Sequence, residues 1–423
     1  MSIKKLEICE GINLYLLPED KFKTFILGAF INTPLTKDTA ARNALLPRIL
    51  ASKTANYKSK KEINLKLDEL YGSRLSFGVA KQGEAHIISI MIDAVSGAFT
   101  NDDNQSETAK LLGEILVNPF CEGECFDKEV VVREKDVVKN AIESIINDKR
   151  QYAVHRCIEE MCHDEAYGIG KYGTVEDVER VDAAGLYFHY KNIIQSAPVD
   201  FIAAGAFNED EIVNLVKEIS EKLGARTACY AKTLTEKETS EVKYVKEEAD
   251  VSQGKLVLGF RTNISPDSEK SCALMVYNGI LGGSPASKLF NNVREKMSLC
   301  YYASSSLDRE KGIMVAQAGI DCENYQKALD AILKQHEDIK DGAFTDEEFE
   351  FSKAAIINAL LSYKDDVGSM TAFYSSKFGK EKIDSLDEMC KKIAAVKKED
   401  IVPVANRIKL DTVYFLCGRA EGK

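Results

Sequence analysis

The feature that most constrains the fold of this chain is an internal repeat. The segment LGAFINTPLTKDTAARNALLPRIL (27–50) resembles LGFRTNISPDSEKSCALMVYNGIL (258–281), because each passes from a β-rich run with Leu-Gly through a turn with Asn and Pro into an apolar helix. Three further matches follow in the same order, namely 67–94 with 293–322, 113–149 with 337–366, and 199–212 with 411–423. Four matches in one order predict a duplicated α+β unit of about 200 residues, within the usual size range of a domain.

Both copies of the repeat have the same predicted order of elements. A short amphipathic helix precedes two strands joined by a glycine turn, at Gly83 in the first copy and Gly312 in the second. Apolar and β-branched residues dominate the second strand of each pair, in HIISIMIDA and IMVAQAGID. A turn with Phe120 or Phe344 then leads into a long helix, and a strand that ends in a glycine turn closes each copy.

The polar, Lys- and Glu-rich stretch between the copies is the predicted linker. We therefore expect an α+β protein of two tandem homologous domains, residues 1–225 and 251–423, with a linker at 226–250. In each domain a mostly antiparallel sheet is expected to pack against helices as an α/β sandwich. The sequence SEVKYVKEE, near the end of the linker, is predicted to form the first edge strand of the second domain.

Composition excludes several classes of function. The chain has 423 residues, a formal net charge of -11 and a pI near 5.3, and this acidic balance argues against nucleic acid, whose phosphates need a basic surface. No run of about 18 apolar residues is present, so we expect no membrane span. The N-terminal residues resemble neither a signal peptide nor a transit peptide. Eleven scattered cysteines are typical of reduced thiols, which favours a cytoplasmic protein.

Metal ligands are scarce in this sequence. The five histidines include no pair at the helical spacing of four. Two groups come closer to a zinc site, Cys121 with Cys125, and Cys157 with Cys162 and His163. Such a site needs about four converging ligands, and the first group is predicted in a loop and the second in a helix. Ordinary thiols are the better interpretation, so no metal or other cofactor is expected in this chain.

The repeat and its local sequences resemble the M16 family of zinc peptidases over nearly the whole chain. This family includes pitrilysin, insulin-degrading enzyme and the mitochondrial processing peptidase, and the resemblance implies their metallohydrolase fold, with two halves around a peptide chamber. In active members the helix after the Gly-Asn-Pro stretch carries His-x-x-Glu-His, and a Glu on a second helix is the third ligand. The two His share one helix face and hold the ion, while the Glu takes a proton from its water.

The resemblance implies that this metal site is degenerate here. The equivalent stretch is ALLPR, in which Ala44 has no lone pair, Pro47 replaces the general base and Arg48 brings a permanent cation. The third ligand should fall in VVKNAIE, where the best match is Ala141, beside Asn140. No histidine occurs from residue 1 to 85, so no shift in alignment restores the motif. The packing face of the helix is still predicted to be core, through Leu45, Leu46, Ile49 and Leu50.

The second copy is much closer to the family pattern. In the family, an Arg and a Tyr seven residues later face the zinc across the chamber, and the matching residues in GGSPASKLFNNVREKMSLCYYASSS are Arg294 and Tyr301. A phenol can donate to the oxyanion that forms on a peptide carbonyl, and a guanidinium can hold a carbonyl. Tyr302, next on the strand, is expected to point to the other face. The glycines of LGGSPASKL lack phosphate-loop spacing and are predicted to form a tight turn between helices.

Two functions remain open at this point. In two-chain bacterial members of the family one chain holds zinc and the other supplies the Arg/Tyr pair, which favours a non-catalytic, peptide-binding subunit of a heterodimeric peptidase. Its partner would carry His-x-x-Glu-His and the only zinc, and this chain would be no enzyme by itself. The alternative is a non-proteolytic scaffold or peptide-binding protein with the same fold. An enzyme with different catalytic residues is a weaker option, and the chain alone could form a homodimer.

Overall fold

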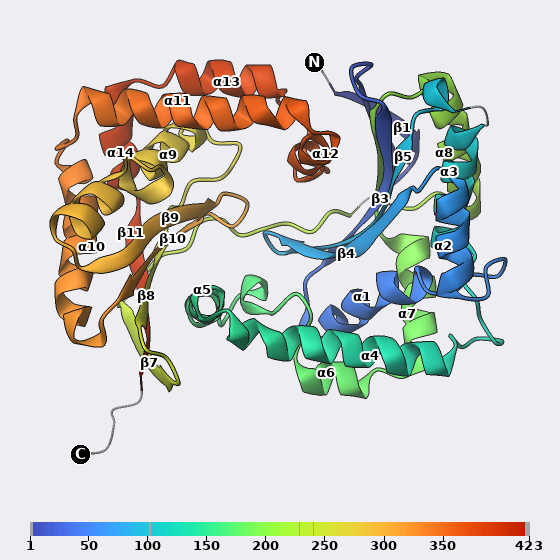
Figure 1. Ribbon diagram of the computed structural model, residues 1–423, viewed down its shortest axis with the longest axis horizontal. Helices are drawn as coiled ribbons and strands as arrows, with labels where there is room; N and C mark the ends of the chain where they lie inside the picture. The colour runs from blue at the N-terminus through green and yellow to red at the C-terminus, as the bar shows by residue number, and fades with distance from the viewer. Residues whose placement is uncertain (1–2, 101–102, 228, 240, 419–423) are drawn as a thin grey trace. The chain divides into compact units, whose positions relative to one another are not determined.

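Two compact units make up the protein in the computed structural model, which describes residues 3–100, 103–227, 229–239 and 241–418. The first unit comprises 1–143, 169–232 and 363–385, and the second comprises 144–168, 233–362 and 386–423. Most of the first unit therefore lies within 1–225 and most of the second within 251–423. The exceptions are two helical segments, 144–168 and 363–385, which each join the unit of the other half (Figure 1).

Unit 1 is a six-stranded sheet packed with helices. The strands lie in the order β1-β2-β6-β3-β5-β4, and every neighbouring pair is antiparallel except β2 and β6. The strands are β1 Lys4–Cys9, β2 Ile12–Pro18, β3 Thr24–Pro34, β4 Arg74–Gln82, β5 Ala85–Val95 and β6 Val199–Gly205. The helices are α1 Lys37–Leu50, α2 Lys60–Glu69, α3 Asn104–Val117, α4 Lys128–Glu143, α6 Val175–Arg180, α7 Ala183–Ser196, α8 Glu209–Leu223 and α12 Val367–Ser375.

Unit 2 repeats this plan with five strands. Their order is β7-β11-β8-β10-β9, and only β7 and β11 are parallel. The strands are β7 Lys243–Ala249, β8 Gly254–Arg261, β9 Cys300–Asp308, β10 Ile313–Ile320 and β11 Lys409–Gly418. The helices are α5 Lys149–Met161, α9 Ser271–Asn278, α10 Tyr325–Lys340, α11 Asp346–Ser362, α13 Leu386–Ala394 and α14 Ile401–Ala405, with two π-helical segments, η4 Gly279–Gly283 and η5 Leu289–Lys296.

The two sheets confirm the predicted fold class and the repeat. The order β2-β6-β3-β5-β4 in unit 1 matches β7-β11-β8-β10-β9 in unit 2, strand for strand and direction for direction. The predicted glycine turns join β4 to β5 at Gly83 and β9 to β10 at Gly312, with φ of 54° and 72°. A side chain would be strained in this left-handed conformation, which glycine adopts freely. The predicted edge strand in SEVKYVKEE is β7.

Both faces of the sheet in unit 1 are covered. Helices α1 and α3 contact one face, and buried aliphatic side chains of sheet and helices form a single large core there. Helix α12, from the second half of the sequence, contacts β3 and β6. The residues after it extend this contact, since the Phe378 ring stacks on Tyr15 with centroids 4.1 Å apart. The exchanged segment thus buries apolar surface that the first half alone would leave open to water.

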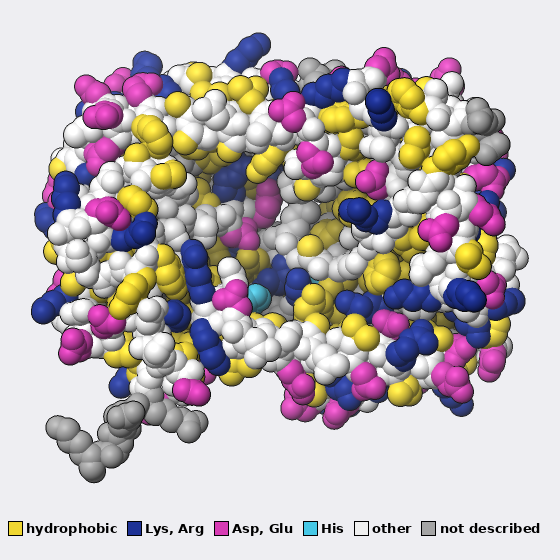
Figure 2. Space-filling model, viewed as in Figure 1, with side chains coloured by type: hydrophobic (Ala, Val, Ile, Leu, Met, Phe, Trp, Pro, Cys, Tyr) yellow, Lys and Arg dark blue, Asp and Glu magenta, His cyan; other side chains and the backbone are white. Residues whose placement is uncertain are grey.

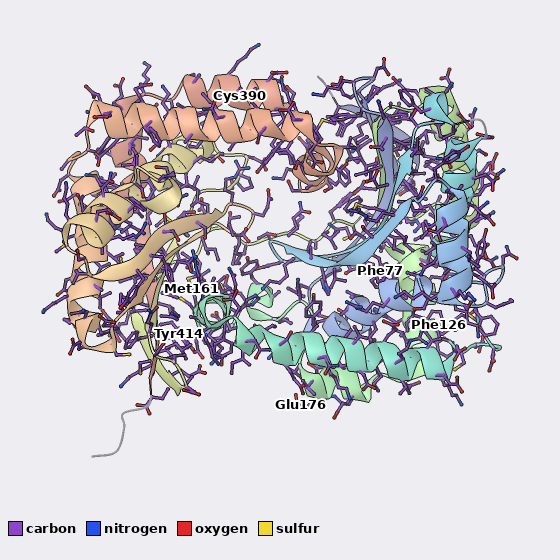
Figure 3. All side chains as sticks on the ribbon, in the orientation of Figure 1. Phe77, Phe126, Met161, Glu176, Cys390 and Tyr414 are labelled. Atoms are coloured by element: carbon purple, nitrogen blue, oxygen red, sulfur yellow. The ribbon has the colours of Figure 1, made fainter. Side chains whose placement is uncertain are left out.

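Helix α5 makes the reciprocal contact in unit 2. It lies on β8, β10 and β11, where Ala153 and Cys157 pack with Val257 and Tyr414 in a buried cluster. Figure 3 labels Tyr414 of β11 and Met161 of α5 where the helix meets this sheet. The approach is close because β8 has a glycine there: a Cβ on Gly259 would lie 2.8 Å from the Met161 sulfur and 3.3 Å from the Cys157 sulfur. Segments 144–168 and 363–385 therefore occupy matching places in the two units.

A buried charge cluster fastens the end of segment 144–168 to unit 2. The Glu165 carboxylate accepts hydrogen bonds from Arg261 Nη1 at 3.1 Å and Nη2 at 2.6 Å, and it pairs with Lys311 Nζ at 2.5 Å and Lys237 Nζ at 3.0 Å. Arg261 also pairs with Asp411 through Nε at 3.0 Å. Burial alone would raise the pKa of Glu165, but the bonds from Arg261, Lys311 and Lys237 outweigh it and lower the pKa to about 2.

The surface carries both signs of charge. Figure 2 shows acidic and basic side chains interspersed over the face in view. Among the described residues, no helix combines the length and the apolar character needed to cross a bilayer.

Candidate functional site

Helix α1 forms as its sequence predicts and packs as a core helix. Thr36 caps its N-terminus by accepting a hydrogen bond from the Thr39 amide at 3.3 Å. The predicted core positions Leu45, Leu46, Ile49 and Leu50 are all at most 3% exposed, so this prediction is confirmed. The interior Pro47 is tolerated in the helix, although it has no amide hydrogen to donate to a carbonyl one turn earlier.

The four degenerate positions lie on two helices that touch, since α1 contacts α4. Ala44 and Pro47 are buried on α1, and Ala141 is half-buried on α4. Arg48 turns toward α4 and reaches Glu134, with Nη1 3.8 Å from Oε2. An ion pair with a buried carboxylate therefore stands beside the positions that would carry metal ligands.

Glu134 was not identified from the sequence. The residue is 6% exposed, and its carboxylate also lies 3.4 Å from Arg133 Nε and 3.4 Å from the Ser52 hydroxyl. The sequence feature that could have identified Glu134 is its spacing from Ala141, because residues seven apart share a helix face. Its oxygens already have cationic and hydroxyl partners, so this carboxylate is neutralised within the chain.

These residues do not fit a zinc ion. The two positions that would need imidazoles carry the methyl group of Ala44 and the guanidinium of Arg48. Pro47 stands in place of the general base, and the methyl group of Ala141 stands in place of the carboxylate ligand. In the described ranges of the chain, no group of three or more His, Cys, Asp or Glu side chains could hold a metal ion. The two cysteine groups are separate: Cys121 and Cys125 flank a tight turn, and Cys157 and Cys162 are buried thiols with raised pKa values because of burial.

A polar network lies next to the degenerate site, and sequence reasoning missed it. The Asn43 amide donates to Thr33 Oγ1 at 3.0 Å and lies 3.1 Å from His86 Nδ1, while its oxygen is 2.7 Å from His189 Nε2. Burial lowers the pKa of each imidazole to about 4, so both are neutral at pH 7. Because the histidines are 103 residues apart, no sequence spacing reveals their convergence. The network fixes α1 to the sheet and to α7.

Arg294 lies on η5, with its side chain 40% exposed. Its guanidinium carbon sits 4.6 Å from the centre of the Phe290 ring, one helical turn earlier, and its Nε is 3.6 Å from Glu295. Contacts of this kind hold an arginine loosely, because an exposed ion pair contributes little free energy. The guanidinium therefore remains accessible for another partner.

Tyr301 lies on the edge strand β9, and it is 55% exposed. Its hydroxyl donates to Asp321 at 3.1 Å, and this bond raises the pKa of the phenol. Tyr302 points the other way, as expected for the next residue on a strand, and packs against Gly319 and under Arg150, whose guanidinium carbon is 4.3 Å from the ring centre. The phenol seven residues after Arg294 is thus the accessible one.

The glycine-rich stretch before η5 forms the predicted turn between helical segments. Gly282 and Gly283 end η4, and a Cβ on Gly282 would lie 2.6 Å from the Ser305 amide. Lys288, which a phosphate would need, is almost fully buried and pairs with Glu348 at 3.4 Å. The stretch therefore packs η4 against β9.

Known proteins resemble this chain over its full length. A family profile described as "Peptidase M16 inactive domain" matches residues 180–356. "Probable inactive metalloprotease YmfF" from Bacillus subtilis is 32% identical over 410 residues, which cover 96% of each chain. "Uncharacterized zinc protease YmxG" from the same organism is 22% identical and covers 96% of this chain and 95% of its own.

Solved structures give the same result. A conserved protein from Enterococcus faecalis is 31% identical, with a TM-score of 0.92 over 100% of both chains. A peptidase M16 inactive domain from Pseudomonas fluorescens is 16% identical, with a TM-score of 0.81 over 100% of both chains, which shows the same fold.

Proposed function

The chain belongs to the M16 peptidase family as one of its inactive members, and from that premise we propose that it is the non-catalytic subunit of a heterodimeric zinc peptidase. In this proposal it binds peptide and presents Arg294 and Tyr301 to the zinc site of a partner. The partner carries His-x-x-Glu-His and holds the only zinc of the complex. The peptide would lie extended and add a strand to a sheet edge of the partner.

One observation carries the proposal, a contrast between the two units. In unit 1 the ligand positions are buried alanine, proline and an ion-paired arginine, which offer no metal chemistry. In unit 2 the two polar residues of the family pattern are present, and both side chains are accessible. In the proposed role these residues act on a centre outside this chain, because the ligand positions of unit 1 offer none.

The chemistry of the two side chains suits this role. The Tyr301 phenol stays protonated at neutral pH, since its pKa is raised by Asp321, and can donate to an oxyanion on a peptide carbonyl. The Arg294 guanidinium keeps its charge at any working pH and can hold a substrate carbonyl in place. Bacillus subtilis supplies a further argument, because its relatives of this chain include both a probable inactive metalloprotease and an uncharacterized zinc protease.

The test mixes the purified chain with a His-x-x-Glu-His chain of the family from the same genome. The mixture should hydrolyse peptide faster than the partner alone, while this chain alone binds no zinc and cleaves nothing. R294A and Y301F should each remove most of the gain, because loss of one oxyanion donor costs about 10²–10³ in kcat. Y302F is the matched control, since that ring faces the other side of β9, and it should activate normally. Full activation by both R294A and Y301F would refute the proposal.

A second candidate is a scaffold or peptide-binding protein without proteolysis. The observation in its favour is that both side chains have partners in their own chain, Tyr301 with Asp321 and Arg294 with Phe290 and Glu295. Co-purification from the native organism distinguishes the two functions. A complex that contains a His-x-x-Glu-His chain and hydrolyses peptide supports the subunit, and an inert complex supports the scaffold.

A further inference from the structure

One edge of the sheet in unit 2 lacks a strand that unit 1 has. In unit 1, β1 pairs antiparallel with β2 and closes that edge, and α8 contacts both strands. The counterpart of β2 is β7, because each lies parallel to the last strand of its half, β6 or β11. In the described part of the chain, no strand pairs with the outer side of β7. This edge therefore presents backbone groups that can pair with another strand.

The two faces of β7 differ in what they contact. The face toward α5 is held within the unit: Lys243 pairs with Glu160 at 2.5 Å, and Glu247 accepts a hydrogen bond from Tyr152 at 2.6 Å. The other face exposes Tyr244, 62% open to solvent, and the charged side chains of Lys246 and Glu248. In unit 1 the matching side carries α8 beside α3, and the described part of unit 2 has no helix after β11. A large aromatic side chain thus stands uncovered beside an open edge.

We propose that β7 pairs antiparallel with β7 of a second copy of this chain, about a two-fold axis at Glu247. Neighbours across an antiparallel pair lie on the same face, so only a few registers are possible. With the axis at Glu247, Lys246 lies opposite Glu248 of the partner subunit, and the two-fold symmetry makes this pair twice. With the axis at Lys246 the two ammonium groups would repel each other. The chosen register is the one that pairs both exposed charges.

The remaining contacts of this register are compatible with pairing. Val245 lies opposite Ala249 of the partner subunit, on the face that packs toward α5. Glu247 lies opposite its own copy, but Arg156, 3.4 Å away, and the hydroxyls of Tyr152 and Tyr414 hold that carboxylate within its own unit. In the single chain Lys246 Nζ lies 3.7 Å from Glu248 Oε1, and an exposed ion pair of this kind contributes little free energy. Pairing in this register places a further charge of opposite sign across from each of these side chains, and the same charges discourage association with strands that lack this order.

Pairing at β7 is independent of the proposed function. β7 and β9 are the opposite edges of the same sheet, so a second copy on β7 leaves Tyr301 on β9 accessible. The proposal would hold for a scaffold as well as for a peptidase subunit.

Sedimentation velocity of the full-length chain over a dilution series tests the proposal. The wild-type chain should show dimers by the time its concentration in the series reaches about 100 μM. K246E and E248K should each weaken dimerisation about tenfold or more, because each turns two attractive pairs into two repulsive ones. An equimolar mixture of K246E and E248K should dimerise again, because the acidic side chains of one variant then face the basic side chains of the other. The double variant K246E/E248K should also dimerise.

Controls separate this edge from a general effect of charge. K398E changes another exposed lysine, which pairs with Asp346 at 2.6 Å elsewhere in unit 2, and it should dimerise like the wild type. Lys246 and Glu248 are exposed, so the single variants should fold normally, as circular dichroism can verify. A wild-type chain that stays monomeric throughout overturns the proposal. A dimer that both single variants leave unchanged, or a mixture that does not recover, overturns it equally.

Discussion

The substitution Glu165→Gln tests how segment 144–168 is held on unit 2. The native carboxylate neutralises Arg261 and Lys311, which are 1% and 0% exposed, and it also pairs with Lys237. Glutamine keeps the shape of the side chain but removes the negative charge. Arg261 would retain its pair with Asp411, and Lys311 would lose its pair with the Glu165 carboxylate.

The expected cost is large because the stranded cations are buried. Breaking a buried ion pair by removing one partner costs about 3–5 kcal/mol, since an uncompensated charge remains in a poorly solvated site. A typical domain is stable by only about 5–15 kcal/mol, so E165Q should lose a large fraction of the stability of unit 2. The same logic sets a pH dependence. The folded pKa of Glu165 is about 2 and lies below its unfolded value, so its contribution is fully present above about pH 4.5 and is lost as the pH falls toward 2.

Urea unfolding monitored by hydrogen exchange can assign the loss of stability to unit 2. This assignment is needed because a chain of two units need not unfold in one step. Amides of α5 and β8 should lose protection in E165Q, whereas those of β3 and β5 in unit 1 should not. E159Q is the matched control in the same segment, because Glu159 on α5 forms a solvent-accessible pair with Arg156 at 2.6 Å and should cost less than about 1 kcal/mol. Equal stability of E165Q and E159Q would refute the reasoning.

Three further predictions concern unit 1. Urea unfolding at stepped pH should show that the free energy of unfolding falls as the pH is lowered from about 6.5 to 4, by about 3 kcal/mol for each of His86 and His189, because these histidines bind protons in the unfolded chain before they do in the folded one. Burial raises the pKa of Asp200 to about 6, so this carboxyl stabilises the folded chain as the pH falls, and D200N should make the loss of stability steeper. The variant A44H/P47E/R48H/A141E should bind one zinc ion per chain by elemental analysis, because α1 still contacts α4; a metal content equal to wild type would show that the helices have lost the spacing of the family. A fragment of residues 1–232 should be insoluble alone and become soluble when 233–423 is co-expressed, because segment 363–385 covers its sheet. A fragment that is soluble by itself and whose sheet amides are protected from hydrogen exchange would contradict this.

Local features of the structure could be predicted from the sequence. Apolar periodicity identified α1 and its buried face at Leu45, Leu46, Ile49 and Leu50, because helix periodicity reports which side meets the core. The glycines at 83 and 312 marked the two hairpins, since only glycine adopts their backbone conformation without strain. The alternation of a strand separated Tyr301 from Tyr302, and the first is the exposed one.

Long-range features could not be predicted. Nothing in the amphipathic pattern of α5 says which sheet its apolar side meets, so its place in unit 2 follows only from the folded chain. The same limit applies to Asn43 with His86 and His189, and to Glu165 with Arg261, whose partners are far away in sequence. Glu134 lies two turns before Ala141 on the same face of α4. Its contact with Arg48 in the folded chain distinguishes it from the other acidic residues of α4.

The contrast between the two units has a physical basis. Without zinc, a His-x-x-Glu-His site between two packed helices would bury imidazoles and a carboxylate with no partner, and each such group costs free energy. Ala44 and Pro47 at buried positions avoid this cost, and Arg48 pairs with the buried carboxylate of Glu134. Arg294 and Tyr301 are exposed, so replacing them would cost the fold little. Packing therefore explains the residues in unit 1, whereas it does not demand the Arg/Tyr pair of unit 2. Their exposure is compatible with the proposed role of Arg294 and Tyr301 in contact with a partner or a peptide.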